Sequence, residues 1–274
     1  MNIIRGMGAM GEASLDLMMI MCRIVAWPIG TLHYLLVASG ILPPHPAIAA
    51  STAGTSKALR DCWFTRCAQE LFAAVLRTPL RGAAIRRVRF DPAVPYPGGC
   101  VFATIHSPWA RLLAHWCRER HDELVLTRPG WIRHLRDAGV DANFHDLRRM
   151  VSHLRHGHSL FAAIDVFPDK DGCPVRFFGK DREASLLPAR LAAAGGVPMV
   201  AAIAAVRGGR IEFSFGPALR VHGPEGERRA TQALIAYVEA RIADEPAIWN
   251  DTLHSRIWRR VHVGGHHSNY PARE

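Results

Sequence analysis

The chain has 274 residues, of which 49% are hydrophobic and 21% are charged. It carries 34 Lys and Arg residues against 24 Asp and Glu residues, a formal net charge of +10 with the histidines neutral. Such a charge attracts nucleic acid, anionic lipid headgroups or an acidic carrier protein. A nucleic-acid binder more often gathers its basic residues in a polar, lysine-rich stripe. Here they are nearly all arginines spread through apolar segments, which favours a membrane surface and argues against nucleic acid.

The cysteines and histidines do not form a recognisable metal or disulfide pattern. The six cysteines are scattered, with no C-x-x-C pair, and most lie in apolar runs. This usage is typical of reduced thiols in a reducing compartment. The histidine clusters at 153–158 and 262–267 have no carboxylate or cysteine at ligand spacing beside them, so we expect neither a metal site nor a bound cofactor.

Residues 24–42 form an uncharged apolar segment near the N-terminus. It is barely long enough to cross a bilayer, and Pro28, Gly30 and His33 weaken it as a membrane span. A basic start and a cleavage site of small residues are both missing, which argues against a cleaved signal peptide. Two interpretations stay open: a spanning or in-plane membrane anchor, or a buried helical pair broken at Pro28. If the segment spans, the basic residues at 57–66 would keep the body in the cytoplasm.

We divide the chain into an N-terminal apolar helical segment (1–45), one domain (46–262) and a flexible tail (263–274). In the domain, apolar runs predict strands at 86–90, 100–105, 123–127, 160–167, 174–178, 197–206 and 210–215. Helical spacing predicts helices at 108–121, 129–137, 146–157, 183–194 and 229–243. Continuous apolar strands that alternate with helices predict an α/β fold, with a mixed, mostly parallel sheet covered by helices.

Two polar residues follow or end apolar strands of this predicted sheet. His106 comes after CVFATI, and Ser107 and Pro108 behind it are typical of a helix start. Asp165 ends the run LFAAID. Reactive groups gather at the carboxyl ends of strands in open α/β sheets. His106 and Asp165 are therefore candidate catalytic residues, and the alternatives are a histidine at a helix start and an aspartate that caps a loop.

Four blocks of the sequence resemble a known family. IHSPWARLLA resembles the G-H-F-G-N-W-E-L-L-A block of the late lipid A acyltransferases, the lauroyl/myristoyl branch of the lysophospholipid acyltransferase superfamily. LTRPGWIRHLRDAG is similar to the family's Arg-Pro block, and IADEPAIWN resembles its C-terminal Pro-x-x-Trp segment. The closest part runs from DLRRM to VPMV and contains an F-F-G loop followed by a Pro-Ala-x-Leu-Ala helix.

The resemblance implies a glycerolipid acyltransferase-like fold and an acyl-transfer reaction. The donor would be acyl carrier protein or acyl-CoA, and the acceptor a hydroxyl or amine of a lipid. The site would lie on the cytoplasmic face of the inner (plasma) membrane, to which the protein attaches peripherally or by a single anchor. His106 would be the general base.

The sequence departs from the family at one position of the histidine block. The family's H-x-x-x-x-(D/E) is here His106 followed five residues later by Arg111. A guanidinium has no acceptor atom and cannot replace the carboxylate that orients the histidine. Asp165 is then the expected orienting acid. The alternative is a catalytically inactive relative that binds acyl chains or acyl carrier protein.

The remaining candidates are expected to bind substrate. Arg128 matches the family's Arg-Pro arginine, whose forked guanidinium suits an anion. Trp109 and Arg111 belong to the helix that follows His106, and Arg111 is expected to face an acceptor phosphate or the carrier's phosphopantetheine. Phe178 and Gly179 form the F-F-G loop, and Arg182 would face acidic headgroups or the carrier.

Overall fold

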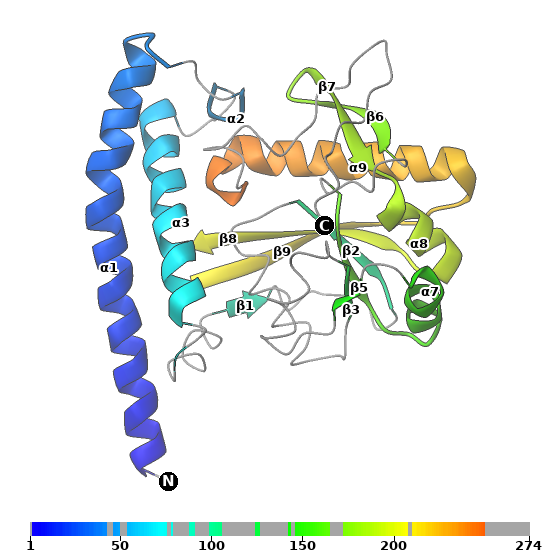
Figure 1. The fold of residues 1–274 in the computed structure, drawn as a ribbon, viewed down its shortest axis with the longest axis horizontal. Helices are drawn as coiled ribbons and strands as arrows, with labels where there is room; N and C mark the ends of the chain where they lie inside the picture. Colours follow the sequence, from blue (N-terminus) through cyan, green and yellow to red (C-terminus); the bar gives the residue numbers. More distant parts are fainter. Residues whose placement is uncertain are drawn as a thin grey trace, which may run out of the picture.

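The computed structural model describes most of the α/β body and the N-terminal helices. The described residues are 2–42, 46–49, 54–75, 78, 88–90, 99–105, 124–126, 142–143, 146–164, 172–207 and 210–249. Figure 1 shows two long helices standing side by side at one end of a twisted sheet. The site residues His106, Trp109, Arg111, Arg128 and Asp165 and the predicted tail lie outside the described residues.

The sheet has seven strands, in the order β1-β9-β8-β2-β5-β3-β4. Their bounds are β1 (Val88–Phe90), β2 (Val101–Thr104), β3 (Leu124–Leu126), β4 (Ala142–Asn143), β5 (Leu160–Ala163), β8 (Met199–Arg207) and β9 (Arg210–Leu219). All neighbouring strands pair in parallel except β8 and β9, which are antiparallel. The predicted mixed, mostly parallel sheet is confirmed.

Helices cover one face of the sheet, where the largest core lies. These are α7 (Leu147–Arg155), α8 (Leu187–Gly195), α9 (Gly223–Asp244) and the short 3-10 helix η1 (Pro246–Ile248). Alternate residues of β2, such as Val101 and Ala103, pack into this core with Leu154 of α7 and Ile235 of α9. The other face carries an aromatic cluster in which Phe102 contacts two more phenylalanines. Burial on both faces explains why these strands read as continuous apolar runs.

A separate hairpin, β6 (Gly172–Phe177) and β7 (Lys180–Ser185), packs on α9. Cys173, Val175 and Phe177 alternate into the core, as expected for a half-buried strand. The predicted helix at 183–194 was wrong at its start, because residues 183–185 belong to β7 and the helix begins at Leu187. β7 has the polar sequence KDREAS, so its strand conformation depends on pairing with β6 rather than on its own apolar pattern.

The predicted N-terminal apolar helix is present as α1 (Asn2–Ala38). It packs along α3 (Thr55–Val75). The short helix α2 (Pro46–Ala49) also contacts α3. Of the two interpretations left open for this segment, the helical pair broken at Pro28 was wrong, since α1 continues through Pro28. Ala26 and Gly30 are buried on both sides of Pro28, which is itself exposed. Packing on α3 thus holds the helix together despite the missing proline N–H.

Close contacts fix the register of α1 against α3. A Cβ atom added at Gly30 would lie 2.8 Å from the Arg60 Cα, so only glycine allows this approach. Nearby, the Trp63 Nε1–H donates to His33 Nδ1 at 3.2 Å. Partial burial lowers the pKa of His33 below its usual value, which favours the neutral ring that this hydrogen bond requires.

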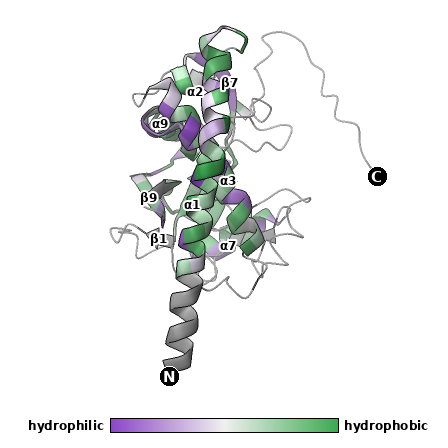
Figure 2. Cartoon of the chain, turned by 90° about the vertical axis from the view of Figure 1, so that its left-hand side faces the viewer, coloured by the Kyte–Doolittle hydropathy of each residue, from purple (hydrophilic) through white to green (hydrophobic). Residues whose placement is uncertain are grey.

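The outer face of α1 is apolar and exposed. Figure 2 looks onto this face, which is largely hydrophobic over its described length. Leu17, Ile24 and Trp27 are 62%, 59% and 59% exposed. Ala13–Ala38 is the one segment of the described chain that is long and apolar enough to cross a membrane, and only 28% of its most apolar window is buried.

Candidate active site

The carboxyl ends of β2 and β5 form the edge at which the sequence predicted catalytic residues. These strands are parallel neighbours, with Thr104 opposite Ala163. The Ile164 N–H donates to the Thr104 carbonyl oxygen at 2.8 Å, which continues the pairing by one residue. Ile105 and Ile164 are both buried. β2 ends at Thr104 and β5 at Ala163, and His106 and Asp165 each follow two residues later in the sequence.

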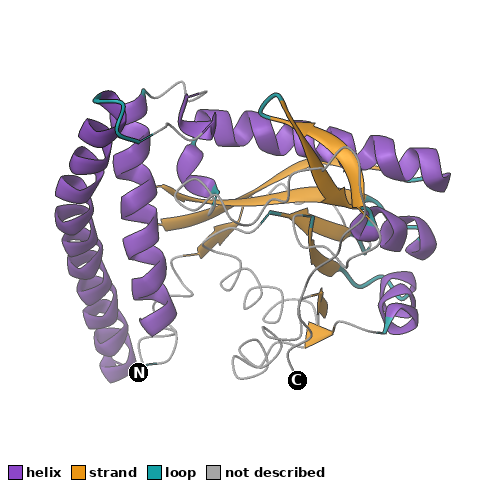
Figure 3. Cartoon of the chain, turned by 45° about the horizontal axis from the view of Figure 1, so that its top comes forward, coloured by secondary structure: helices purple, strands orange, loops and turns teal. Residues whose placement is uncertain are grey.

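This edge of the sheet faces the N-terminal helices. β8 runs parallel to β2, and both Figure 1 and Figure 3 place α3 beyond the carboxyl end of β8. The carboxyl ends of β2 and β5 therefore point toward the same side as the α1–α3 pair.

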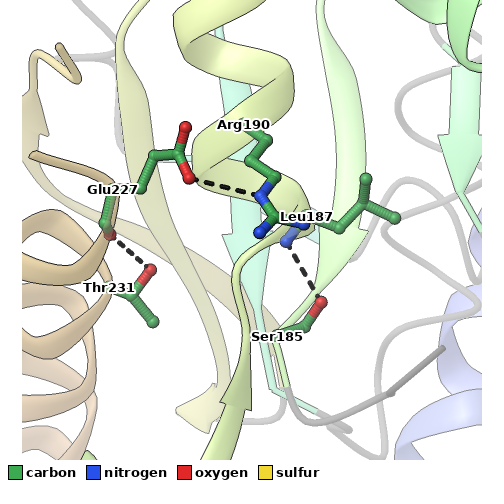
Figure 4. A network of polar contacts seen from close by, with 5 residues as sticks. All are labelled: Ser185, Leu187, Arg190, Glu227 and Thr231. Carbon is green, nitrogen blue, oxygen red and sulfur yellow. Dashed lines mark hydrogen bonds and ion pairs between the residues drawn. The ribbon is translucent and has the colours of Figure 1, made fainter. Parts of the chain in front are cut away.

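Ser185 joins the hairpin to this edge. Its backbone N–H donates to the Ile164 carbonyl oxygen at 2.9 Å, directly before Asp165 in the sequence. Its hydroxyl accepts a hydrogen bond from the Leu187 N–H at 3.2 Å and is buried (Figure 4). This contact satisfies one of the backbone N–H donors that have no partner within the first turn of α8. Pro188 also favours a helix start here, because it has no N–H that needs a partner. Ser185 thus fixes the end of β7 beside the end of β5.

A polar contact between helices holds α8 in place. Arg190 on α8 donates through Nε to Glu227 Oε2 on α9 at 3.2 Å, and Thr231 Oγ1 donates to the Glu227 carbonyl oxygen at 2.8 Å (Figure 4). Glu227 is largely buried and Arg190 is partly exposed. The pair links the helix that begins at the candidate edge to the longest helix of the body.

The tip of the β6–β7 hairpin is a tight turn with an unusual residue. Phe177 pairs with Lys180, so Phe178 and Gly179 form a two-residue loop, and both have positive φ (48° and 68°). This matches a type I′ turn. A left-handed conformation costs a residue with a side chain roughly 1–2 kcal/mol, which the surroundings of Phe178 must offset.

Two residues from the C-terminal part of the chain stabilise this turn. The Phe178 N–H donates to Glu239 Oε2 on α9 at 2.8 Å. Trp249 packs edge-on against Phe177, with ring centroids 5.2 Å apart, and stacks on Phe178 at 6.4 Å. The F-F-G and Pro-x-x-Trp segments, singled out separately in the sequence, therefore form one cluster.

The hairpin tip lies away from the strand ends. Five residue steps along β7 separate Lys180 from Ser185, which is about 17 Å at strand spacing. Arg182 lies between them, half-buried and opposite Val175. Of the predicted site residues, Phe178, Gly179 and Arg182 thus share one hairpin whose base, and not its tip, meets the end of β5.

Residues 116–259 match the family model of the bacterial lipid A biosynthesis acyltransferases, more than half of the chain. The chain belongs to this family. No curated protein sequence matches it. Among solved structures it is similar to the 1-acyl-sn-glycerophosphate (LPA) acyltransferase PlsC from Thermotoga maritima, at 11% identity and a TM-score of 0.36. That alignment covers 79% of this chain and 97% of PlsC.

The family assignment confirms the predicted resemblance, and the chain is a lipid acyltransferase by family. The matched range contains Arg128, Asp165, Phe178, Gly179 and Arg182, and it begins ten residues after His106. The histidine block with His106, Trp109 and Arg111 therefore stays outside the match, and its role stays a prediction.

Sequence reasoning did not name Glu239 or Trp249 as site residues. Trp249 had a signal, since the segment before it resembles the acyltransferase pattern. No sequence signal pointed to Glu239, because its hydrogen bond with Phe178 joins residues that are 61 positions apart in the chain. In the described part of the chain, no group of three or more His, Cys, Asp or Glu residues could hold a metal ion.

Proposed function

We propose that this acyltransferase moves a fatty acyl group from the thioester of acyl carrier protein or coenzyme A to a hydroxyl or amine of a lipid acceptor, with His106 as general base. The observation that carries the proposal is the register of β2 and β5. Thr104 lies opposite Ala163, and Ile164 is bonded to Thr104. In the sequence, His106 follows β2 and Asp165 follows β5, and these two strands are parallel neighbours in one sheet.

The reaction needs one base and a partner that orients it. His106 takes the proton of the acceptor hydroxyl or amine through one ring nitrogen, and the acceptor attacks the thioester carbonyl carbon. The tetrahedral intermediate collapses, the carbon–sulfur bond breaks, and the leaving thiolate takes the proton back from the imidazolium. Asp165 accepts a hydrogen bond from the other ring nitrogen and stabilises the imidazolium.

The basic candidates suit the anionic parts of both substrates. Arg111 and Arg128 bind phosphate groups of the acceptor or of the carrier's phosphopantetheine, since a guanidinium donates two parallel hydrogen bonds. Trp109 packs beside them. The hairpin residues Phe178, Gly179 and Arg182 contact substrate or carrier at a distance from the reacting carbonyl, because the tip lies about 17 Å from the β7 end.

We place the reaction on the cytoplasmic face of the inner membrane. The exposed apolar face of α1 supports membrane contact, as does the net charge of +10, which attracts anionic headgroups. Five cysteines in the described part of the chain are free thiols, in keeping with a reducing compartment. Both thioester donors would be available on that side.

The contact between α1 and α3 supports an in-plane position for α1. α3 lies alongside α1 and carries Lys57, Arg60, Asp61, Arg66 and Glu70 over much of its length. If α1 crossed the bilayer with α3 beside it, these charges would enter the hydrocarbon. Each Lys, Arg or Asp at the bilayer centre costs about 2.5–3.5 kcal/mol on insertion scales. An α1 helix that lies in the interface, apolar face down, avoids this cost.

His106→Ala tests the proposed base. Purified protein is mixed with labelled acyl carrier protein or acyl-CoA and a total lipid extract, and acylated products are read by mass spectrometry. We expect the variant to fold normally and to lose activity by on the order of 10²–10⁴. Wild-type turnover by a folded His106→Ala protein would end the assignment of His106 as base.

A further inference from the structure

A cavity of about 540 Å³ opens between α1, α3 and the segment that joins α9 to η1. α1 contributes Arg23 and Trp27 to its wall, one to two turns before the close contact at Gly30. Lys57, Arg60 and Phe64 of α3 line the opposite side. The cavity is separate from the β2–β5 edge and from the hairpin, and the proposed reaction does not use it.

The charges of this wall favour an anion. It contains three cations, Arg23, Lys57 and Arg60, and two carboxylates, Asp61 and Glu245. Lys57 and Asp61 neutralise each other, with their charged atoms 3.7 Å apart. Within the described residues, neither the Arg23 nor the Arg60 guanidinium forms an ion pair.

Both arginines are held where they line the cavity. The Arg23 guanidinium lies over the Phe64 ring, 4.9 Å from its centroid, a cation–π contact that restricts its movement. Arg60 is half-buried, and its Cα and Cγ atoms lie where they would meet a side chain on Gly30. Packing thus restricts the Arg23 guanidinium and the stem of Arg60, and the two residues line one cavity from neighbouring helices. Guanidinium groups in such a cavity suit a phosphate.

The cavity is continuous with the apolar face of α1. Trp27 lines the cavity and also belongs to that exposed face, together with Ile24 about one turn earlier and Ile20 about two turns earlier. An amphipathic indole at such a boundary is typical of the membrane–water interface. A bound phosphate would thus have an apolar surface beside it on which acyl chains could lie.

We infer that this cavity binds the phosphate of an anionic membrane phospholipid, whose acyl chains lie along the exposed face of α1. The lipid is a resident of the membrane that holds the protein to the surface, and it is not the acyl acceptor. The inference rests on the proposed membrane location, and its experiment does not depend on the proposed reaction.

Vesicle flotation with matched double variants tests the inference. Full-length protein is floated with neutral phosphatidylcholine vesicles and with vesicles that also contain phosphatidylglycerol. Arg23→Gln with Arg60→Gln empties the cavity of its unpaired cations. Arg220→Gln with Arg229→Gln removes the same charge from exposed positions around the start of α9, at the other end of that helix from η1.

We expect the cavity variant to lose roughly tenfold or more of the binding that phosphatidylglycerol adds, since each arginine at an anionic surface contributes measurably. The control variant should bind like wild type. An equal loss in both would assign the effect to overall charge, and no loss in either would remove the site; both results overturn the inference. Binding to neutral vesicles through α1 should stay unchanged in both.

Two further measurements test whether free phosphate binding or loss of stability could explain a lower binding to the vesicles. Inorganic phosphate should release no more protein than chloride at equal ionic strength, whereas selective release by phosphate would mean that the cavity takes the free ion and would overturn the lipid assignment. Each variant's thermal unfolding is compared with that of wild type. If the cavity pair lowers the unfolding temperature, the single variants Arg23→Gln and Arg60→Gln replace it and should each show a smaller loss. Failure of acyl transfer in wild type would leave these binding results unchanged.

Discussion

Arg111 occupies the position at which the resemblance of the histidine block predicts a carboxylate. A guanidinium cannot accept the N–H of an imidazole, so an active enzyme needs another acceptor for His106. Ile164, the residue before Asp165, donates a backbone hydrogen bond to Thr104 of β2, and His106 follows that strand in the sequence. Asp165 is therefore our candidate for this acceptor. We therefore propose different roles for the two residues: Asp165 would act on the chemical step, and Arg111 on substrate binding.

Asp165→Asn and Arg111→Ala should affect different kinetic constants. Asparagine is nearly isosteric but uncharged, so Asp165→Asn should lower kcat strongly, because it no longer stabilises the imidazolium. Arg111→Ala should mainly raise KM for the anionic substrate, since it removes binding that is equal in ground and transition states. Steady-state kinetics with varied acceptor concentration measures both.

Arg111→Glu is the matched control for this pair. In an active enzyme it should repel the anionic substrate and impair turnover. A wild-type protein that is inactive with every donor, together with an active Arg111→Glu variant, would identify the chain as a binding relative. Full kcat in Asp165→Asn would show that another residue orients His106.

At the scale of elements, the hairpin tip is held by a carboxylate that reaches it from α9. Glu239→Ala leaves the Phe178 N–H without its 2.8 Å acceptor while the turn keeps its left-handed residue. We expect a loss of about 1.5–3 kcal/mol in the free energy of unfolding, the range for hydrogen bonds to charged groups. Glu239→Gln retains an acceptor oxygen and should lose less.

Chemical denaturation of both Glu239 variants, beside Glu70→Ala, measures this difference. Glu70 forms an exposed ion pair with Arg66 at 3.1 Å, and such pairs contribute about 1 kcal/mol or less. Equal destabilisation by Glu239→Ala and Glu70→Ala would contradict the role given to Glu239.

The α1–α3 pair should weaken in mild acid. His33 accepts a hydrogen bond from Trp63 and has a lowered pKa because of burial. The folded state therefore prefers the neutral ring, so its contribution is present above the unfolded pKa of about 6.5 and is lost as the pH falls through the folded value. Thermal unfolding in nonionic detergent should show a lower midpoint at pH about 5.5 than at about 7.5.

His33→Gln isolates this contribution, because glutamine offers an acceptor oxygen to Trp63 but does not titrate. The acid-induced fall in the midpoint should be smaller in His33→Gln than in wild type. His222→Gln, at an exposed histidine before α9, should behave like wild type. Identical pH dependence in all three proteins would refute the assignment.

The elements that the sequence predicted best are those whose pattern is set by burial alone. The runs at 100–105 and 197–206 are strands because both faces of the central sheet are covered. β7 was missed because KDREAS is polar and becomes a strand only through pairing with β6. α1 passes through Pro28 because tertiary packing on α3 outweighs the local preference of proline.

For the candidate site as well, local features could be predicted from the sequence and long-range contacts could not. An apolar strand followed by His106, and another closed by Asp165, could be read from the sequence, since polar residues at strand ends are a local signal. That β2 and β5 are neighbours with Thr104 opposite Ala163 could not, because strand order depends on the whole sheet. The contact of Trp249 with Phe177 and Phe178 likewise joins segments about 70 residues apart in sequence.

At the scale of the whole molecule, the carboxyl edge of the sheet, the α1–α3 pair and the apolar face of α1 define one orientation. The strand ends point toward the helices, and the outer face of α1 points away from the body (Figures 1 and 2). With that face in the interface, α3 lies between α1 and the sheet, so the carboxyl ends of the strands face the bilayer across the helix pair (Figure 1).

This orientation predicts that the N-terminus and the body lie on the same side of the membrane. A spanning α1 would put them on opposite sides and would carry the charges of α3 into hydrocarbon. Protease cleavage of a tag at residue 1 and of a tag after residue 274 is compared in inside-out and right-side-out vesicles. We expect both tags to be cut only in inside-out vesicles, and opposite accessibility would refute the in-plane position.

The same orientation predicts how the protein leaves the membrane. Apolar contact is insensitive to salt, whereas attraction between the +10 chain and anionic lipid is screened. Wild-type protein should stay membrane-bound in high salt, and a variant with Leu17, Ile24 and Leu32, three exposed residues of the outer face, changed to Gln should be released. If this variant remains bound in high salt, the outer face of α1 is not the surface that enters the interface.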